Sequence, residues 1–338
     1  MTCMSQLEIE DAAVAMIEQR GRAIMERVKQ DILNTTYDHH GSIDLALQHY
    51  AKVNLPLVMP IFPALMSLSY EATTGVQKNT VLDSVSVAMM FIAFSADIHD
   101  DIIDKSDVKY AKKTVCGKFG SEIALLASDV LLIHGHTLLY QACETLSSTQ
   151  RQEISLSVSK ALFELSSAEA LEFKLSKEVV VAPDEHFEVM RLKGVFAELQ
   201  CRLGGIIGQA NGELLEDLVR YGRAVGMFGA IKDEFSDMLN VSELVHRIKF
   251  ECPPLPLVYA VADETVKAVL GTLVEQFDYS KIAAKKVAKL ILGSKNVYGL
   301  KQKINEQISQ ELKNLDSIKK SRAEHDIFLL LRALSIDA

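Results

Sequence analysis

The sequence predicts an all-α protein in which one helical bundle spans residues 1–338 as a single domain. The seven prolines fall in only three places, at 56–63, 183 and 253–256, so long stretches are free of the residue that breaks helices. Apolar residues within those stretches recur at helical spacing, and no alternating run with an Asn-Gly or Asp-Gly turn indicates a sheet.

The elements follow from that pattern in chain order. The first twenty residues are acidic and amphipathic and lack the apolar core of a signal peptide. The most apolar run, LPLVMPIFPALMSL at 55–68, is too short for a bilayer and carries three prolines, so we expect no transmembrane segment. Helical stripes then follow at Ile123, Leu126, Val130, Ile133 and Leu138, and at Val189, Leu192, Phe196, Leu199, Leu203 and Ile206. Two breaks, at 104–122 and 239–256, each follow an acidic cluster.

Composition excludes several classes of function. The net charge of −9 and the pI of about 5.5 argue against a nucleic-acid partner, which needs a basic surface. The five cysteines are scattered and form no CxxC pair, so neither a disulfide framework nor a zinc site is indicated. We therefore expect a reducing, cytoplasmic location.

The first acidic cluster ends an apolar helix. Asp100, Asp101 and Asp104 form DDxxD within FSADIHDDIIDKSD, residues 94–107. Carboxylates four apart on a helix share a face, repel each other by about 0.2–0.5 kcal/mol per pair and, at a helix C-terminus, oppose the macrodipole. A divalent cation offsets both costs, and Mg²⁺ prefers one or two carboxylates together with water and phosphate oxygens.

The second cluster repeats the spacing. Asp233, Glu234 and Asp237 lie in KDEFSD, again at the end of an apolar helix and again before a break. Two such helices facing each other would form a central cavity with a metal-binding cage open to a diphosphate. A solvated acidic face is the alternative for either cluster alone, while an EF-hand is disfavoured because the spaced ligands and the glycine are missing.

These residues carry a family resemblance. IHDDIIDKSDVKYAKKTVCGKFG resembles the first aspartate-rich motif of the trans-prenyl diphosphate synthases, HDDxxDxxxxRRGKPTVxxxFG. SEIALLASDVLL resembles the family's NxxALLAGDxLL, MRLKGVFAELQCRLGG its helix with a Lys-Thr pair, GMFGAIKDEFSD its second motif GxxFQIxDDxLD, and CPPLPLVYA the TLPLIxA that follows. The similarity covers residues 45 to 265 in the family's order.

The resemblance implies an isoprenoid-synthase helical bundle, commonly dimeric, and a transferase of isoprenoid biosynthesis. In the family, two or three Mg²⁺ ions hold an allylic diphosphate, the C–O bond ionises, and isopentenyl diphosphate attacks the allylic cation. The implied metal ligands are Asp100, Asp101, Asp104, Asp233, Glu234 and Asp237. Lys193 matches the diphosphate-binding lysine, and Lys109 stands at the first arginine of the RRG motif; both are implied catalytic and substrate-binding residues.

The isopentenyl half of the site departs from the family. GKRxRP aligns with AKVNLP at 51–56, so Lys52 is kept while both arginines are lost. Tyr110 replaces the second arginine of RRG, and Ala93 replaces a histidine. Arg247 and Lys249 are candidates to compensate for the family's late lysines; the alternative is that both are solvated charges.

Three functions remain open at this point. The first is a prenyl diphosphate synthase of the farnesyl or geranylgeranyl type with an atypical isopentenyl site. The second is a non-autonomous subunit that pairs with a complete synthase chain rather than forming a homodimer. The third is a prenyltransferase or cyclase that ionises an allylic diphosphate but uses another acceptor.

Product length is indicated only by the residues before the first motif. In the family, side chains four and five positions earlier line the tail pocket, and here they are Ala96 and Ser95, with Ile92 nearby. Small side chains there predict a longer product, of about twenty carbons or more. The alternative is that they only allow close helix packing.

Overall fold

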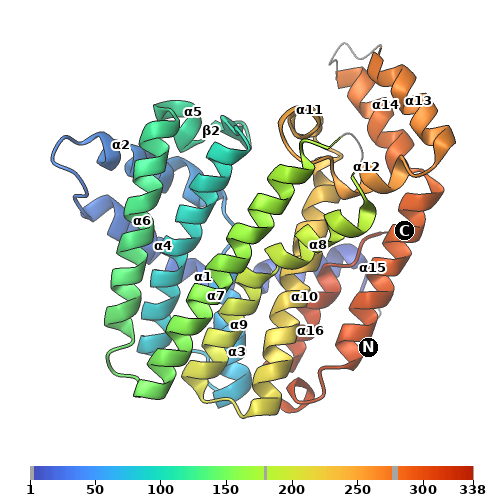
Figure 1. Cartoon of the computed structure of the whole chain (residues 1–338). Helices are drawn as coiled ribbons and strands as arrows, with labels where there is room; N and C mark the ends of the chain where they lie inside the picture. The colour runs from blue at the N-terminus through green and yellow to red at the C-terminus, as the bar shows by residue number, and fades with distance from the viewer. Residues whose placement is uncertain (1–3, 179–180, 276–280, 338) are drawn as a thin grey trace.

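The computed structural model describes residues 4–178, 181–275 and 281–337. As the sequence predicts, it is a bundle of long helices (Figure 1). The first half contains α1 (Gln6–Asn34), α2 (Ser42–His49), η1 (Tyr50–Asn54), η2 (Leu55–Leu57), α3 (Ile61–Thr74), α4 (Thr80–Ile103), β1 (Val108–Lys109), β2 (Lys112–Lys113), α5 (Val115–Phe119), α6 (Ser121–Ala142) and α7 (Ser148–Leu175). The second half contains α8 (Pro183–Lys193), α9 (Val195–Gly208), α10 (Gly212–Asp237), α11 (Val241–Phe250), α12 (Leu255–Ala260), α13 (Glu264–Glu275), α14 (Lys281–Leu292), α15 (Lys295–Lys313), η3 (Ile318–Lys320) and α16 (Glu324–Ala333).

Helix α4 is the most deeply buried long helix near the acidic clusters. The Asn79 side chain caps its start by accepting from the backbone N–H groups of Val81 and Leu82. Residues 85–92 are all buried, so no face of this stretch meets water. The apolar middle fixes α4 in the bundle and carries Asp100 and Asp101 to its last turn.

Close helix contacts set the positions of α6 and α10. A Cβ at Gly135 of α6 would lie 2.8 Å from Cγ1 of Ile92, so glycine lets α6 lie directly against α4. A Cβ at Gly226 of α10 would lie 2.7 Å from Cα of Gly194, at the junction of α8 and α9. Gly194 therefore brings the end of α8, which carries Lys193, against α10.

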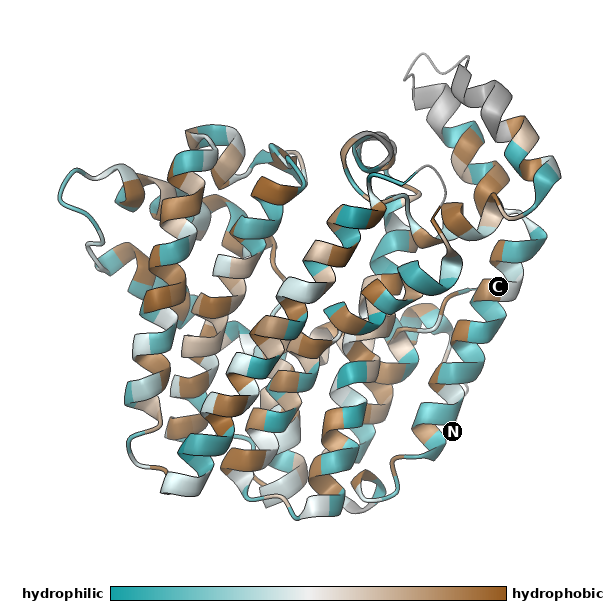
Figure 2. Cartoon of the chain, in the orientation of Figure 1, coloured by the Kyte–Doolittle hydropathy of each residue, from teal (hydrophilic) through white to brown (hydrophobic). Residues whose placement is uncertain are grey.

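The two predicted stripes differ in burial. The stripe on α8 and α9 is mostly buried, although a break at Gly194 divides it into two helices. On α6 the helix is confirmed, but its buried face consists of other residues, and Leu126 and Ile133 of the stripe are 49% and 66% exposed. Hydrophobic residues accordingly recur along this outer helix (Figure 2).

The two breaks contain more structure than the sequence predicts. Residues 104–122 include the β1–β2 hairpin, paired Val108 with Lys113, and the short helix α5. Residues 239–256 include α11. Both segments lie at the end of the bundle where α4 and α10 terminate (Figure 1).

The expectation about membrane spans overlooked two helices. In the described part of the chain, α4 and α6 are long and apolar enough to cross a membrane by length and composition. The apolar window of α4 is 72% buried inside the protein, whereas that of α6 is 33% buried. Burial in the bundle accounts for the apolar character of α4, and the outward face of α6 needs another explanation.

Candidate active site

The two acidic clusters lie at the same end of the bundle, and α11 links them. Asp104 is the C-cap residue of α4, and α10 ends at Asp237. His246 of α11 lies between them, with Nε2 at 3.0 Å from the backbone oxygen of Asp104 and at 3.3 Å from Oε1 of Glu251. The structure therefore brings the predicted clusters to one region.

The first cluster carries carboxylates that lack full compensation. Burial, only partly offset by Lys109, raises the pKa of Asp101 to about 7. Burial, Asp100 and Glu251 raise the pKa of Asp104 to about 8. Such shifts mean that the negative charge is costly where it stands, and a bound cation would relieve that cost.

Lys109 of β1 reaches into the first cluster. Its Nζ lies 2.7 Å from Oδ1 of Asp101, 3.2 Å from Oδ1 of Asp97 and 3.6 Å from Oδ2 of Asp100. Burial alone would lower the pKa of this ammonium, but the three aspartates raise it well above its usual value. Asp97 also accepts a hydrogen bond from the Tyr50 hydroxyl at 3.0 Å. This bond fixes the Asp97 carboxylate that pairs with Lys109.

The hairpin that carries Lys109 has a strained turn. Tyr110 and Ala111 both have positive φ, at 51° and 60°, and Ala111 stands where the family's RRG motif has glycine. The Thr114 hydroxyl fixes the junction between the hairpin and α5. It donates to the Ser106 carbonyl at 2.7 Å and accepts from Gly117 N. Lys109 is thus presented by a short, tied hairpin.

Helix α7 supplies a third group of carboxylates, which the sequence did not predict. Glu172 pairs with Nζ of Lys193, and Glu169 lies 3.7 Å from the same atom. Burial raises the pKa of Glu169 to about 7, and the negative charge of Asp100 contributes to the rise. The only signal was a Glu-x-x-Glu spacing on one helix face, which is common on solvated helices.

Glu234 of the second cluster is bound entirely by the protein. Its carboxylate accepts from His186 Nε2 at 3.0 and 3.1 Å, from Arg247 Nη2 at 2.6 Å and from Leu255 N at 2.7 Å. Burial alone would raise its pKa, but Arg247, His186 and the Leu255 N–H lower it to about 2. On its other side, His186 Nδ1 lies 3.2 Å from Sγ of Cys252, and that buried thiol has a pKa raised to about 12.

Arg247 is the buried counter-charge of this cluster. It donates from Nη1 to Oδ2 of Asp237 at 2.8 Å and from Nη2 to Glu234, and its Nε lies 3.4 Å from Oε2 of Glu251. Only 8% of its side chain is exposed. Asp233 is exposed at the rim, and no ion pair of its side chain is seen among the described residues; partial desolvation and Asp237 raise its pKa to about 6.

The remaining predicted site residues are dispersed. Lys52 is exposed in η1, where the neighbouring Asn54 donates to the Lys113 carbonyl at 3.2 Å. Lys249 lies in α11, and its side chain is outside the described part of the structure. Both substrate-binding assignments, and that of Arg247, stay predictions.

The predicted tail-pocket residues pack against α6. Ser95 is buried and exchanges a hydrogen bond with Ser128, whose hydroxyl lies 2.9 Å from the Ser95 carbonyl. Ile92 is buried opposite Gly135, while Ala96 is partly exposed. For Ser95 the contacts match the close-packing alternative, and a tail-pocket role of the three residues stays a prediction.

The donor set of the first cluster fits a hard divalent ion. Asp100 and Asp104 are carboxylates one helical turn apart, and the latter has a raised pKa. Within the described residues, no three His, Cys, Asp or Glu side chains are grouped closely enough to hold a metal by themselves. An ion here would therefore take only one or two protein ligands, which is how Mg²⁺ binds when substrate phosphates and water complete its shell.

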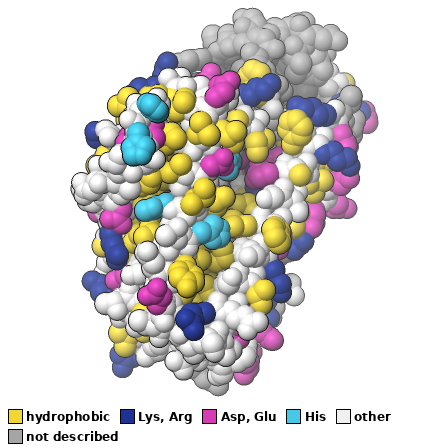
Figure 3. Space-filling view, turned by 60° about the vertical axis from the view of Figure 1, so that its left-hand side comes forward, with side chains coloured by type: hydrophobic (Ala, Val, Ile, Leu, Met, Phe, Trp, Pro, Cys, Tyr) yellow, Lys and Arg dark blue, Asp and Glu magenta, His cyan; other side chains and the backbone are white. Residues whose placement is uncertain are grey.

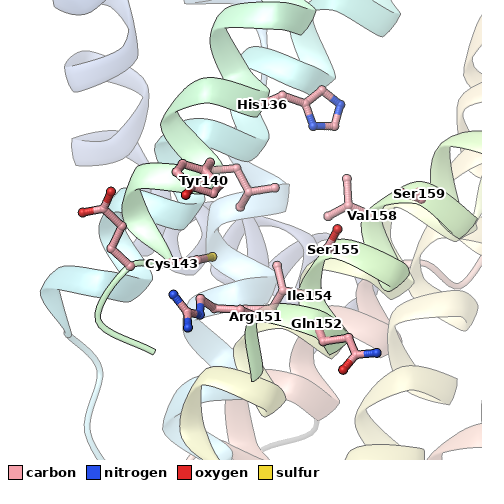
Figure 4. Close-up of a pocket in the computed structure, with 11 residues that line it drawn as sticks. His136, Tyr140, Cys143, Arg151, Gln152, Ile154, Ser155, Val158 and Ser159 are labelled. Atoms are coloured by element: carbon pink, nitrogen blue, oxygen red, sulfur yellow. The ribbon is translucent and has the colours of Figure 1, made fainter. Parts of the chain in front are cut away.

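A separate pocket lies at the opposite end of α6 and α7 (Figure 4). Its volume is about 510 Å³. His136, Tyr140 and Cys143 come from the α6 side, and Arg151, Ile154 and Val158 from α7. It contains none of the predicted site residues.

Known proteins resemble this chain in sequence. A geranylgeranyl diphosphate synthase of Methanosarcina mazei is 28% identical over 193 residues, which cover 55% of this chain and 57% of that enzyme. Heptaprenyl diphosphate synthase component 2 of Geobacillus stearothermophilus is 22% identical over 264 residues, 76% of this chain and 78% of that protein. The matched part of the chain thus spans just over half of the length of the first of these relatives.

Solved structures share the fold. A geranylgeranyl pyrophosphate synthetase from Pyrococcus horikoshii superposes with a TM-score of 0.79 at 22% identity, covering 97% of this chain and 99% of that one. A geranylgeranyl pyrophosphate synthase from Corynebacterium glutamicum, complexed with isoprenyl diphosphate and magnesium, gives 0.72 at 16% identity over 98% and 99% of the two chains. The sequence profile named Polyprenyl synthetase matches residues 60–291, well over half of the chain. With the two aspartate clusters at one end of the bundle, this match shows that the chain belongs to the polyprenyl synthetase family.

Proposed function

We propose that this chain is a prenyltransferase that binds an allylic diphosphate through Mg²⁺ and extends it with isopentenyl diphosphate. The observation that carries the proposal is the first cluster, in which Asp101 and Asp104 have pKa values near 7 and 8 beside the incompletely compensated Asp100. In a family that acts on prenyl diphosphates, this uncompensated negative charge would bind the divalent ion that holds the diphosphate.

The residues that would hold the ion are Asp100 and Asp104, with Asp101 beside them at the end of α4. Bound there, Mg²⁺ would neutralise the charge that develops on the departing diphosphate. Its shell would be completed by water and by phosphate oxygens of the substrate.

The chain's own cations would bind and orient the diphosphate. Lys193 is held at the end of α8 by Glu172 and Glu169. Lys109 is held by Asp97 and Asp101, and its longer 3.6 Å contact with Asp100 is the one most easily replaced by an ion. Each lysine is fixed on one side by carboxylates and can offer its remaining N–H donors to phosphate oxygens.

The isopentenyl side of the site is proposed to be weak rather than absent. Lys52 remains exposed there, while Leu55 is buried in the core and Tyr110 stands exposed in the hairpin. Replacing two or three charge-assisted contacts, each worth about 1.5–3 kcal/mol, should raise the KM for isopentenyl diphosphate strongly.

The test is a turnover assay of the purified chain with Mg²⁺ and a radiolabelled allylic diphosphate, with and without isopentenyl diphosphate. The proposal expects a longer labelled prenyl diphosphate only when isopentenyl diphosphate is present. Asp104→Asn should strongly reduce extension, whereas Asp107→Asn, which changes an exposed carboxylate in the same segment, should not. Diphosphate release that ignores isopentenyl diphosphate would replace the proposal with another acceptor or a cyclisation.

A second candidate is a subunit that works only in an oligomer. The face formed by α6 and α7, here called the α6–α7 face, exposes large apolar side chains: Leu125, Leu126, Ile133, Tyr140, Leu156, Phe163 and Phe173. Figure 3 shows hydrophobic side chains gathered on the side of the molecule that includes α6. Exposed apolar surface of this extent is typical of an interface, and one relative is a component of a heptaprenyl diphosphate synthase.

We therefore propose that the α6–α7 face binds another prenyl synthase chain, either a second copy or a different subunit. The pocket of Figure 4 opens on this face and would receive a partner's side chain. Light scattering should give a dimer mass for the wild type and a monomer mass for Ile133→Glu with Phe163→Glu. Val76→Glu, at an exposed apolar residue elsewhere, is the control. A monomeric wild type that is inactive alone would direct the search to a heterologous subunit.

A further inference from the structure

The second cluster already contains a cation. We propose that the Arg247 guanidinium takes the place of a divalent ion at Glu234 and Asp237, so that the metal ions of this site are held from the α4 side. The inference rests on the proposed function, because it specifies how the same site would bind its ions and its diphosphate.

Glu234 is already occupied by three N–H donors. Its carboxylate accepts from Arg247 Nη2 at 2.6 Å, from Leu255 N at 2.7 Å and from His186 Nε2, whose single N–H is shared between the two oxygens at 3.0 and 3.1 Å. The side chain is 3% exposed, so neither oxygen faces the site. Glu234 therefore serves to anchor Arg247 rather than to bind an ion.

Asp237 also pairs with Arg247, but through only one of its two carboxylate oxygens. Its Oδ2 accepts from Arg247 Nη1 at 2.8 Å, so the guanidinium bridges Asp237 and Glu234 through two different nitrogens. The Nε atom of Arg247 lies 3.4 Å from Oε2 of Glu251. A planar, permanently charged fork with three carboxylate neighbours is a fixed arrangement that a divalent ion would have to displace.

The two ion pairs leave part of the guanidinium without a carboxylate partner. Each terminal nitrogen of Arg247 carries two N–H groups, and the pairs with Asp237 and Glu234 use one on each. The diphosphate would then be bound by ions held on the α4 side, while the buried guanidinium neutralises the carboxylates on the α10 side.

The test counts bound ions without requiring turnover. Mn²⁺ is titrated into the full chain in the presence of saturating inorganic pyrophosphate, and free Mn²⁺ is followed by electron paramagnetic resonance. Asp104→Asn should lose about one ion per chain relative to the wild type, while Asp237→Asn should lose none. Arg247→Met should gain about one, because the vacated Glu234 and Asp237 would then need a counter-ion.

Matched variants separate the possible failures. Arg191→Met removes an exposed arginine that pairs with Glu188 on α8, and it should leave the count unchanged. Arg247→Lys keeps a charge and should also show no gain. Loss of an ion in Asp237→Asn, or no gain in a folded Arg247→Met, would overturn the inference.

The proposed function fails differently. If the wild type binds no Mn²⁺ with pyrophosphate, or if Asp104→Asn loses none, the first cluster is not a metal site and the proposed function falls with it. If Arg247→Met does not fold, as judged by circular dichroism, the comparison of wild type with Asp237→Asn still decides the matter.

Discussion

The two acidic clusters have the same spacing, but their buried carboxylates, Asp101 and Glu234, have opposite electrostatics. Both place carboxylates at i, i+1 and i+4 in the last turn of a long helix. In the first cluster, Asp101 and Asp104 have pKa values raised to about 7 and 8, while in the second the pKa of Glu234 is lowered to about 2. The difference comes from the cation supplied from elsewhere in the fold.

The difference in pKa between the clusters follows from two kinds of cation. Lys109 is a single ammonium on a hairpin, 32% exposed, and it leaves Asp104 without an ion pair in the described structure. Arg247 is a buried fork that bridges Glu234 and Asp237. A carboxylate that remains under-compensated can accept an exchangeable ion, whereas one satisfied internally, such as Glu234, stabilises the fold. The spacing of carboxylates thus does not by itself identify a metal site.

The largest expected effect concerns activity. Replacing both Asp100 and Asp104 with asparagine should lower kcat by about 10³-fold, since a bound ion contributes several kcal/mol to stabilising the leaving diphosphate. Steady-state kinetics at saturating Mg²⁺ would measure it, with Asp107→Asn as the control. A double variant within about tenfold of wild type would show that the first cluster is not the ionisation site.

The next effect concerns stability at the second cluster. Glu234→Gln should lower the free energy of unfolding by about 3 kcal/mol or more, because it leaves the buried Arg247 with reduced compensation. Urea denaturation in EDTA would measure it. The double variant Glu234→Gln with Arg247→Met should lose less than the two single losses added together, since the two residues form one network. Additive losses would mean that they act independently.

The first cluster should respond in the opposite direction. Asp104→Asn should raise the free energy of unfolding of the metal-free protein by about 1 kcal/mol at pH 8, because it removes a charge whose neighbours repel it. The folded-state pKa is raised from 3.8 to about 8, so the folded protein keeps a proton that the unfolded chain loses. Wild-type stability therefore falls as pH rises across that window, and the advantage of Asn should grow there and level off above it.

Denaturation at several pH values in EDTA would check this sign. A destabilising Asp104→Asn at pH 8 would mean that the carboxylate is satisfied within the protein, and the contrast between the clusters would disappear.

The smallest effect concerns the hairpin that carries Lys109. Ala111 has a φ of 60°, a conformation that costs a residue with a Cβ about 1 kcal/mol and glycine almost nothing. Ala111→Gly should therefore stabilise the protein by about 0.5 kcal/mol once the greater freedom of glycine in the unfolded chain is subtracted. Thermal unfolding would measure it, and a loss of stability would show that the turn is not strained.

The sequence was sufficient for the bundle and for the approach of the two clusters. Helical spacing and the positions of the prolines predict long helices, and the resemblance places Asp100 and Asp233 on facing ones. The sequence was insufficient to predict which cation pairs with each carboxylate. Arg247 and Glu234 are thirteen residues apart in one short segment, and nothing in their spacing indicates a buried pair. Likewise Glu169 and Glu172 look like a solvated helix face until α7 packs beside Lys193.

Helix α6 shows a related limit. Its apolar stripe predicts the helix correctly, but a stripe indicates only that a face is covered and not what covers it. In the single chain, Ile133 is 66% exposed, while small residues such as Ala127 and Gly135 face α4. Periodicity alone could not distinguish a face buried in the fold from one suited to a partner chain.

The most direct test of the contrast between the clusters is a crystal structure of the chain with Mn²⁺ and inorganic pyrophosphate, with the ions located by anomalous scattering. The account predicts peaks within about 2.0–2.6 Å of carboxylate oxygens of Asp100 or Asp104, while Glu234 keeps its contacts with Arg247 and His186. An ion bound by Glu234, with Arg247 displaced, would contradict it.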